Sequence, residues 1–195
     1  TTTLSISGSA SVTEGASSSY TVSLTSPAQT AVTVNLAYSG TATNGADFTG
    51  VATVTVAAGS SSATIAIATI DDLIDEVAAE SFTVSVTSAT GGNFENLVVS
   101  GSNNSVTTAV TDNDNAPSIS VSSPTAAEAG GLAQFTLSRS NPSSTATTVS
   151  LALADGTASG ADYGPALEVS TDGGATWTNA SSATFAAGAT SLLVR

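Results

Sequence analysis

The sequence predicts an all-β protein made of tandem antiparallel β-sandwiches, the second of which is incomplete. Three observations support this: short stretches in which apolar and polar residues alternate, clusters of Gly, Pro, Asn and Ser between them, and a motif that occurs twice. Alternation with a period of two turns one face of a strand to the core, and Thr and Val favour the pleated sheet. Several short strands separated by regular turn signals are typical of a β-sandwich.

The strands of the first copy follow from these alternating stretches in chain order. They are expected near residues 20–24, 32–38, 54–56, 65–67, 82–86, 97–99 and 106–110. Turn signals such as Ser26-Pro27 and Asn44-Gly45 separate them. The stretch DDLIDEVAAE (71–80) contains Ala and Glu that could form a helical turn, and we interpret it as a loop.

The internal repeat predicts two domains. GTATNGADF at 40–48 matches GTASGADY at 156–163, and similar segments precede and follow both motifs. In the second copy a hairpin-like insertion, VSTDGGATW, interrupts the correspondence. We therefore expect a complete sandwich at 1–115 and a second at 116–195 that lacks its C-terminal strands, with Ala116-Pro117 as a short linker. An odd number of antiparallel strands would place the copies head to tail, as in a stalk.

The composition excludes most catalytic and nucleic-acid-binding classes. The 195 residues include 15 acidic residues, two arginines and no Lys, His or Cys, which gives a formal net charge of −13. A Ser-His-Asp triad, a His/Cys zinc site and a lysine Schiff base are therefore ruled out. Two cations cannot follow a phosphate backbone, so no nucleic-acid partner is expected. No stretch approaches the ~18 apolar residues of a membrane-spanning helix, so no membrane insertion is expected.

The acidic residues of the first copy are predicted to meet at one rim of the sandwich. This copy contains ten carboxylates and no basic residue. Glu14, Glu80 and Asp112 each continue the core-facing alternation of a strand beyond its end, and such positions converge at a sandwich rim. Asp71 and Asp72 are adjacent and cannot both face inward from a strand, so they belong to a loop.

Such a concentration of negative charge predicts a bound cation. Two carboxylates about 5.5 Å apart repel each other by roughly 3 kcal/mol at an effective dielectric constant of 20. Calcium takes six to eight oxygen ligands, whereas magnesium prefers a smaller octahedral site that keeps its waters, so Ca²⁺ is the expected ion. The alternative is a solvated acidic face that only aids solubility.

Four motifs in order resemble the Calx-beta domain family. They are VTEG at 12–15, GTATNGADF at 40–48, IDDLIDEVAAESFTVSV at 70–86 and TDND at 111–114. The resemblance covers all of the first copy and the first two-thirds of the second. It implies immunoglobulin-like β-sandwiches that bind calcium at the rim where the last strand exits, as in large bacterial surface proteins of the adhesin type.

Carried over by position, the resemblance implies a set of calcium ligands. In the first copy these are Glu14, Asp47, Asp71, Asp72, Glu76, Glu80, Asp112 and Asp114, with a backbone carbonyl from Ile74. In the second copy only Glu128 and Asp162 match the motifs. Asn113 stands where some family members have a further Asp, so the site has one charge fewer.

Together these inferences predict a non-enzymatic, calcium-binding structural spacer of a secreted or cell-surface protein, with neighbouring repeats of the same protein as partners. A glycosidase carboxylate pair is disfavoured, because cationic neighbours are absent and most aromatic residues of the first copy fit core positions. Two alternatives remain open. One is an adhesion module that binds a surface glycan or protein through loops such as 171–177, and the other is a filament subunit that self-associates through strands of a neighbour.

Overall fold

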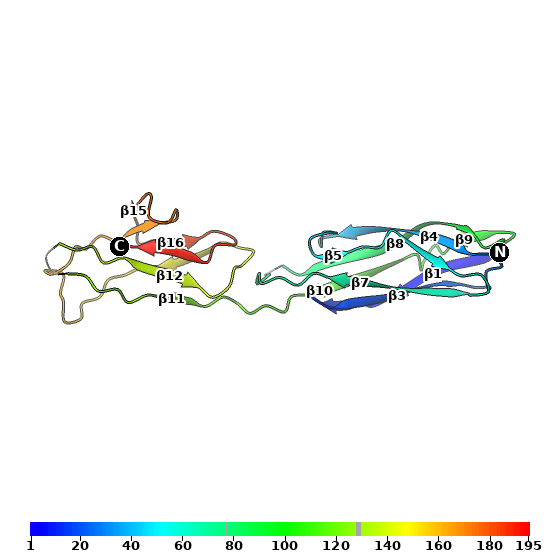
Figure 1. Ribbon diagram of the computed structural model, residues 1–195, viewed down its shortest axis with the longest axis horizontal. Helices are drawn as coiled ribbons and strands as arrows, with labels where there is room; N and C mark the ends of the chain where they lie inside the picture. Colours follow the sequence, from blue (N-terminus) through cyan, green and yellow to red (C-terminus); the bar gives the residue numbers. More distant parts are fainter. Residues whose placement is uncertain (77, 128–129) are drawn as a thin grey trace. The chain divides into compact units, whose positions relative to one another are not determined.

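The computed structural model describes residues 1–76, 78–127 and 130–195, and all their regular structure is β-strand (Figure 1). The all-β prediction is therefore confirmed. The chain forms two compact units, Thr1–Asp72 with Ala78–Asn113 and Leu73–Val77 with Asp114–Arg195. The domain boundaries given above, 1–115 and 116–195, stay predictions. Among the described residues no helix is long and apolar enough to cross a membrane.

The first unit is a sandwich of two five-stranded sheets. One sheet has the order β5 (Phe48–Thr49), β7 (Ser62–Thr69), β3 (Ser17–Leu24), β1 (Thr2–Gly8) and β9 (Leu97–Val99). The other has the order β2 (Ser11–Thr13), β10 (Ser105–Thr111), β8 (Glu80–Gly91), β4 (Val32–Gly40) and β6 (Thr53–Val56). At the described residues 71–76, 78 and 79 the loop prediction agrees with the structure, and β8 begins at Glu80.

Two edge pairings differ from the antiparallel expectation. β9 pairs with β1 and β2 pairs with β10 in parallel, whereas the other paired strands of this sandwich are antiparallel. The second case has a simple cause, because the chain leaves one sheet after Gly8 and enters the other at Ser11. It thereby extends the direction of β1 into the opposite sheet, where β10 runs the same way.

The core between these sheets consists mainly of small aliphatic side chains that pack around a few aromatic rings. Phe48 stacks on Phe82 with ring centroids 4.3 Å apart, and both side chains are almost fully buried. Burying a side chain of this size stabilises the fold by about 1.5–3 kcal/mol. The Tyr20 hydroxyl on one sheet contacts the Thr108 hydroxyl on the other. The Thr108 hydroxyl donates to the Ser9 carbonyl at 2.6 Å, so these two buried hydroxyl groups have hydrogen-bond partners.

The second unit has one five-stranded sheet and one two-stranded sheet. The first has the order β11 (Ile119–Val121), β12 (Phe135–Arg139), β17 (Ser191–Val194), β14 (Glu168–Ser170) and β15 (Thr178–Asn179). The second contains only β13 (Thr147–Ser150) and β16 (Ser182–Phe185). By the repeat, β12 and β13 correspond to β3 and β4. In the described part of this unit no strand corresponds to β8 or β10, and the extent of the second domain stays a prediction.

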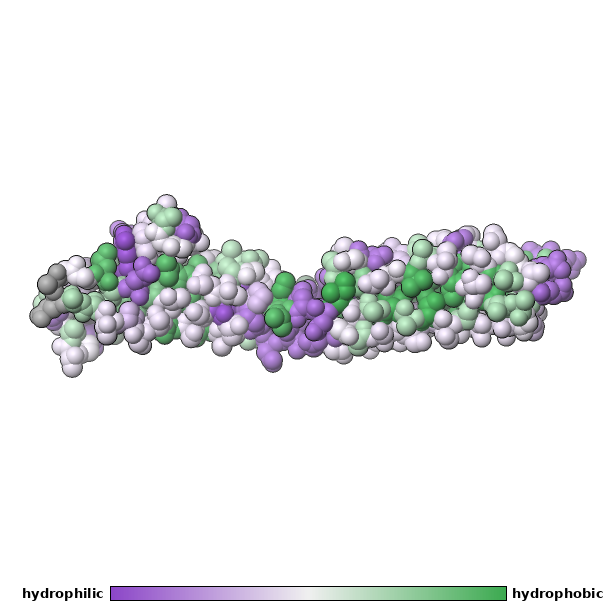
Figure 2. Space-filling model, viewed as in Figure 1, coloured by the Kyte–Doolittle hydropathy of each residue, from purple (hydrophilic) through white to green (hydrophobic). Residues whose placement is uncertain are grey.

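The surface is mostly weakly polar. Figure 2 shows pale residues over most of the visible face, with strongly hydrophilic residues gathered in a few places. This pattern follows from a chain in which only 9% of residues are charged.

Candidate metal centre

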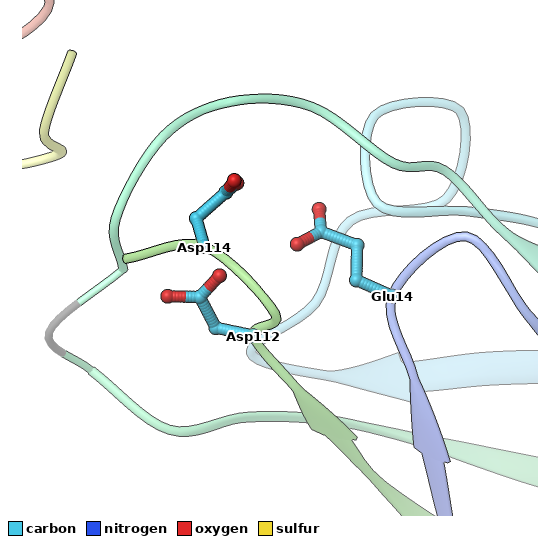
Figure 3. A group of neighbouring side chains, drawn as sticks. All are labelled: Glu14, Asp112 and Asp114. Carbon is cyan, nitrogen blue, oxygen red and sulfur yellow. The ribbon is translucent and has the colours of Figure 1, made fainter. Parts of the chain in front are cut away.

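One group of three carboxylates is formed by Glu14, Asp112 and Asp114. Each residue offers a carboxylate oxygen, and the three oxygens lie within 4.8 Å of one another. In Figure 3 the three side chains point toward a common space, Glu14 from the loop after β2 and the two aspartates from the segment after β10. Oε2 of Glu14 and Oδ2 of Asp114 are shielded from solvent.

The parallel pairing of β2 with β10 brings this group together. Its register aligns Thr13 with Thr111, and the Glu14 N–H donates to the Thr111 carbonyl at 3.0 Å. The next residues, Glu14 and Asp112, are thus side by side although they are 98 positions apart in sequence. The ends of these two strands therefore lie together at one rim of the sandwich, as the alternation of the sequence predicted.

Asn113 connects this group to the neighbouring loop. Its side-chain amide donates to Asp71 Oδ1 at 2.9 Å and to the Glu14 carbonyl at 3.1 Å. The sequence alone indicates only that Asn113 lowers the negative charge of the site by one. The amide instead supplies a hydrogen-bond donor between acidic neighbours, where another carboxylate would add repulsion. The available signal was its place between two aspartates in TDND.

A second acidic group lies on the same rim and contains Asp47, Glu76 and Glu80. Their carboxylate oxygens are again within 4.8 Å of one another, and all three residues are half-buried. Glu80 is paired with Val110 in the sheet, two residues before Asp112. Burial raises the pKa of Glu80 first, and the adjacent Asp47 carboxylate raises it further through charge repulsion and a hydrogen bond.

The GTATNGADF turn fixes Asp47 in this position. The Asp47 carboxylate accepts a hydrogen bond from the Thr43 N–H, and its carbonyl accepts one from the Ile70 N–H at 2.9 Å. The second of these bonds holds the turn against the start of the acidic loop. Phe48, the next residue, is anchored in the core. The motif therefore places a carboxylate at the rim by burying the ring that follows it.

The remaining predicted ligands of the first copy lie in the acidic loop. Asp71 and Asp72 are exposed and Ile74 is half-buried. Asp71 adjoins the first group through Asn113. Neither Asp71 nor Asp72 belongs to the two groups of carboxylates, and their role as ligands stays a prediction, as does that of the Ile74 carbonyl.

Of the two predicted ligands of the second copy, the structure describes Asp162. Asp162 is exposed, and its Oδ2 accepts hydrogen bonds from the Ser159 N–H at 2.8 Å and the Ser159 hydroxyl at 3.1 Å, which lower its pKa. Within the described ranges Asp162 is in neither cluster of three acidic residues. Glu128 lies outside the described residues. Ligand roles for both residues stay predictions.

Trp177, the aromatic residue of the inserted hairpin, is covered on one face. The Arg195 guanidinium lies 4.2 Å from its ring centroid and is held by an ion pair with Glu168 at 2.7 Å. The indole N–H donates to the Gly174 carbonyl at 3.0 Å. Asp172 accepts from Thr176 and Ser170, and these hydrogen bonds lower its pKa strongly. These contacts fix the hairpin, so the structure gives Trp177 a packing role.

The rim chemistry suits a hard divalent cation. Two half-buried carboxylate groups provide oxygen donors and negative charge, and the described part of the first unit contains no basic side chain to neutralise them. Calcium accepts such oxygen-only sites with irregular geometry. Glu14, Asp112 and Asp114 could hold one ion, and Asp47, Glu76 and Glu80 could hold another.

Two family models match the chain. Residues 1–113 match the LapA domain family, and residues 112–174 match the Calx-beta domain family. One similar solved structure, "Crystal structure of Apo-form Calx CBD1 domain", is 21% identical, covers 58% of this chain and 98% of that chain, and has a TM-score of 0.48. Among curated proteins no relative matches the chain.

The expected resemblance to Calx-beta domains is confirmed, and its match lies on the second copy. The first copy matches a different family, which its sequence motifs did not indicate. The matched domains are non-catalytic and typical of secreted surface adhesins, and Calx-beta domains bind calcium. Because the match at residues 1–113 covers more than half of the 195 residues, the chain belongs to the LapA domain family.

Proposed function

We propose that the chain is a calcium-stiffened spacer of a cell-surface adhesin, which extends other domains away from the cell. The observation that carries this proposal is the convergence of two groups of three carboxylates on one rim of the first sandwich. A solvated acidic face would need no such convergence, because exposed carboxylates lower their mutual repulsion by spreading apart.

Calcium would contribute stability to a core built from small residues. Extracellular calcium modules typically bind with Kd values of about 10⁻⁴ to 10⁻³ M. At a free calcium concentration about ten times Kd, binding stabilises each site by roughly 1.4 kcal/mol. This is a large fraction of the net stability of a domain, which is about 5–15 kcal/mol.

The spacer role is supported by where the ligands lie along the chain. Asp112 and Asp114 directly precede Asn115-Ala116-Pro117, the short segment that leads into the second copy. An ion held by these aspartates and Glu14 would tie the start of that segment to the first sandwich. The segment would then lose conformational freedom when calcium binds, and force could pass between the copies with less bending.

Thermal unfolding with and without calcium tests the metal site. The 195-residue chain is heated in chelator, in millimolar magnesium and in millimolar calcium. We expect calcium to raise the first-unit transition by several degrees, since about 1 kcal/mol shifts Tm by roughly 4–8 °C in a domain of this size. The variant Asp112→Asn with Asp114→Asn removes two of the three carboxylates of one group and should lose about half of that increase. The matched control, Asp155→Asn with Asp162→Asn in the second copy, should keep it.

X-ray scattering tests the spacer role separately. If calcium stiffens the junction, profiles in calcium and in chelator should differ in the flexibility they report for the two units. Identical flexibility in both conditions would remove the spacer role and leave the calcium site intact. An unchanged Tm in calcium would remove the metal site itself, and the acidic rim would then serve solubility only.

A further inference from the structure

The GTATNGADF turn of the first copy contains Asn44-Gly45, the one Asn-Gly pair of the sequence. In such a pair no side chain shields the backbone nitrogen that follows the asparagine, so this nitrogen can attack the asparagine side-chain amide. Both residues are exposed. Gly45 has φ +95°, a conformation that other residues rarely adopt, so the turn itself requires glycine at this position. The fold therefore keeps a chemically reactive pair at an exposed site.

Two hydrogen bonds restrain the groups that would react. The Gly45 N–H donates to the Phe48 carbonyl at 2.7 Å, and Asn44 Oδ1 accepts from the Gly50 N–H at 2.9 Å. The first bond opposes loss of the proton from the attacking nitrogen, and the second fixes the orientation of the amide. While both bonds are made, attack of the nitrogen on the amide carbon is disfavoured.

The residues around the pair keep the turn closed. Phe48 is 1% exposed and anchors the turn in the core, and the Asp47 carboxylate accepts from the Thr43 N–H. The N–H groups of Ala46 and Asp47 donate to the Thr43 carbonyl at 3.1 and 2.9 Å. The residues from Thr43 to Ala46 are all exposed. Exposed hydrogen bonds of this kind can open locally while the sandwich stays folded.

The second copy has a shorter turn that lacks the pair. GTASGADY is one residue shorter than GTATNGADF, and Ser159 stands in place of Thr43-Asn44. The Ser159 N–H donates to Asp162, as the Thr43 N–H does to Asp47. The capping bond is therefore made with or without an asparagine, and the reactive residue is particular to the first copy.

We propose that Asn44 is a site of spontaneous deamidation whose rate is governed by opening of its turn. When the turn opens, the Gly45 nitrogen bonds to Asn44 Cγ and loses its proton, the bond from Cγ to Nδ2 breaks, and ammonia leaves. Water then adds to one of the two carbonyl groups of the cyclic imide and opens the ring. The products are aspartate and isoaspartate, so an uncharged amide is replaced by a carboxylate in the same turn as Asp47.

The two products have different consequences for the turn. Aspartate at position 44 still offers an oxygen to the Gly50 N–H, so the turn can close again. Isoaspartate inserts an extra carbon into the main chain before Gly45 and displaces the Gly45 N–H from the Phe48 carbonyl. Either product adds negative charge near Asp47, which already lies within an acidic group, and so increases the repulsion there.

Peptide mapping by tandem mass spectrometry tests the proposal on the full chain. The protein is incubated at neutral pH, folded in one sample and unfolded by guanidinium chloride in the other. Both samples contain chelator, so a bound cation does not enter the comparison. We expect Asn44 to be the fastest-reacting asparagine of the unfolded chain. In the folded chain it should react at least about ten-fold more slowly, because the turn must first open.

Two substitutions of Asp47 test whether the turn controls the rate. Both remove the same charge, but Asp47→Asn keeps an oxygen that can accept from the Thr43 N–H, whereas Asp47→Ala does not. In the folded chain we expect Asp47→Ala to accelerate deamidation of Asn44 several-fold and Asp47→Asn to leave it near the rate of the unsubstituted chain. Asp162→Ala, the control in the second copy, should not change the rate.

Each outcome bears on one part of the proposal. An unreactive Asn44 in the unfolded chain would overturn the modification site. Equal rates in the folded and unfolded chains would overturn protection by the turn, and so would equal rates in Asp47→Ala and Asp47→Asn. Circular dichroism must show that each variant is folded. If Asp47→Ala does not fold, the comparison of folded and unfolded chains still decides the matter.

Discussion

The two copies of the GTATNGADF motif share a sequence pattern but have different environments. In the first copy Phe48 is buried and stacked on Phe82, which β8 supplies. In the second copy Tyr163 is only half-buried, and its hydroxyl bonds to Asp155. Both aspartates of the motif accept a hydrogen bond from the turn, but only Asp47 joins an acidic group. The local turn therefore follows from the motif, whereas the acidic group needs the strands that pack around it.

Removing the motif's ring should give the largest difference between the copies. Phe48→Ala is expected to destabilise the first unit by about 3–5 kcal/mol, because it leaves a cavity against Phe82. The counterpart Tyr163→Ala should change the unfolding of the second unit little. Denaturant titrations that follow each unit check the pair. Similar losses in both units would mean that the second motif is also packed into a core.

A methyl group added to the first glycine of the motif should have the next largest effect. Gly40 has φ +135°, and a Cβ there would lie 2.2 Å from the Ser81 carbonyl oxygen. Gly40→Ala should therefore cost about 2 kcal/mol or more, from backbone strain and displacement of β8. At the corresponding Gly156 a Cβ would meet no atom within 4 Å. Gly156→Ala is the matched control and should leave the melting curve unchanged.

Replacing the motif aspartate should separate the copies by calcium response. Asp47→Asn keeps the oxygen that caps the turn but removes one charge from the rim group, so the calcium-dependent stabilisation, roughly 1.4 kcal/mol at a ten-fold excess over Kd, should decrease. Asp162→Asn should leave the response to calcium unchanged. Calorimetric titration with calcium measures both. Equal weakening by the two variants would indicate a site in the second copy as well.

Acidification in chelator should affect the units in opposite directions and by the smallest amounts. The pKa of Glu80 is raised above its ordinary value of 4.5. Its contribution to the free energy of unfolding is therefore present at low pH and is lost as the pH rises through the raised pKa. The first unit should therefore become slightly more stable on acidification toward 4.5. The pKa of Asp172 is lowered from 3.8. Its contribution to the free energy of unfolding is therefore present above pH 3.8 and is lost as the pH falls toward the lowered pKa. Melting temperatures measured as a function of pH check this. Glu80→Gln should remove the pH dependence of the first unit that is described here, and Asp172→Asn should remove that of the second unit.

The sequence by itself determined most of the local structure. Period-two alternation located strands such as β4 and β8, and the phase of Glu14 and Asp112 indicated that both continue core-facing rows to the rim. These features could be predicted because side-chain direction in a strand depends only on neighbours along the chain. The absence of basic residues from the first copy could likewise be read directly and pointed to a cation.

Tertiary structure alone decided which equivalent residues became buried. The parallel pairing of β2 with β10 joined Glu14 to Asp112, and the amide of Asn113 bridged two acidic neighbours. Leu36 and Leu151 have the same sequence context, yet one is in the core and the other borders an open cavity. Alternation specifies which face of a strand is apolar, but burial requires a partner strand, and that partner is brought by residues distant in the sequence.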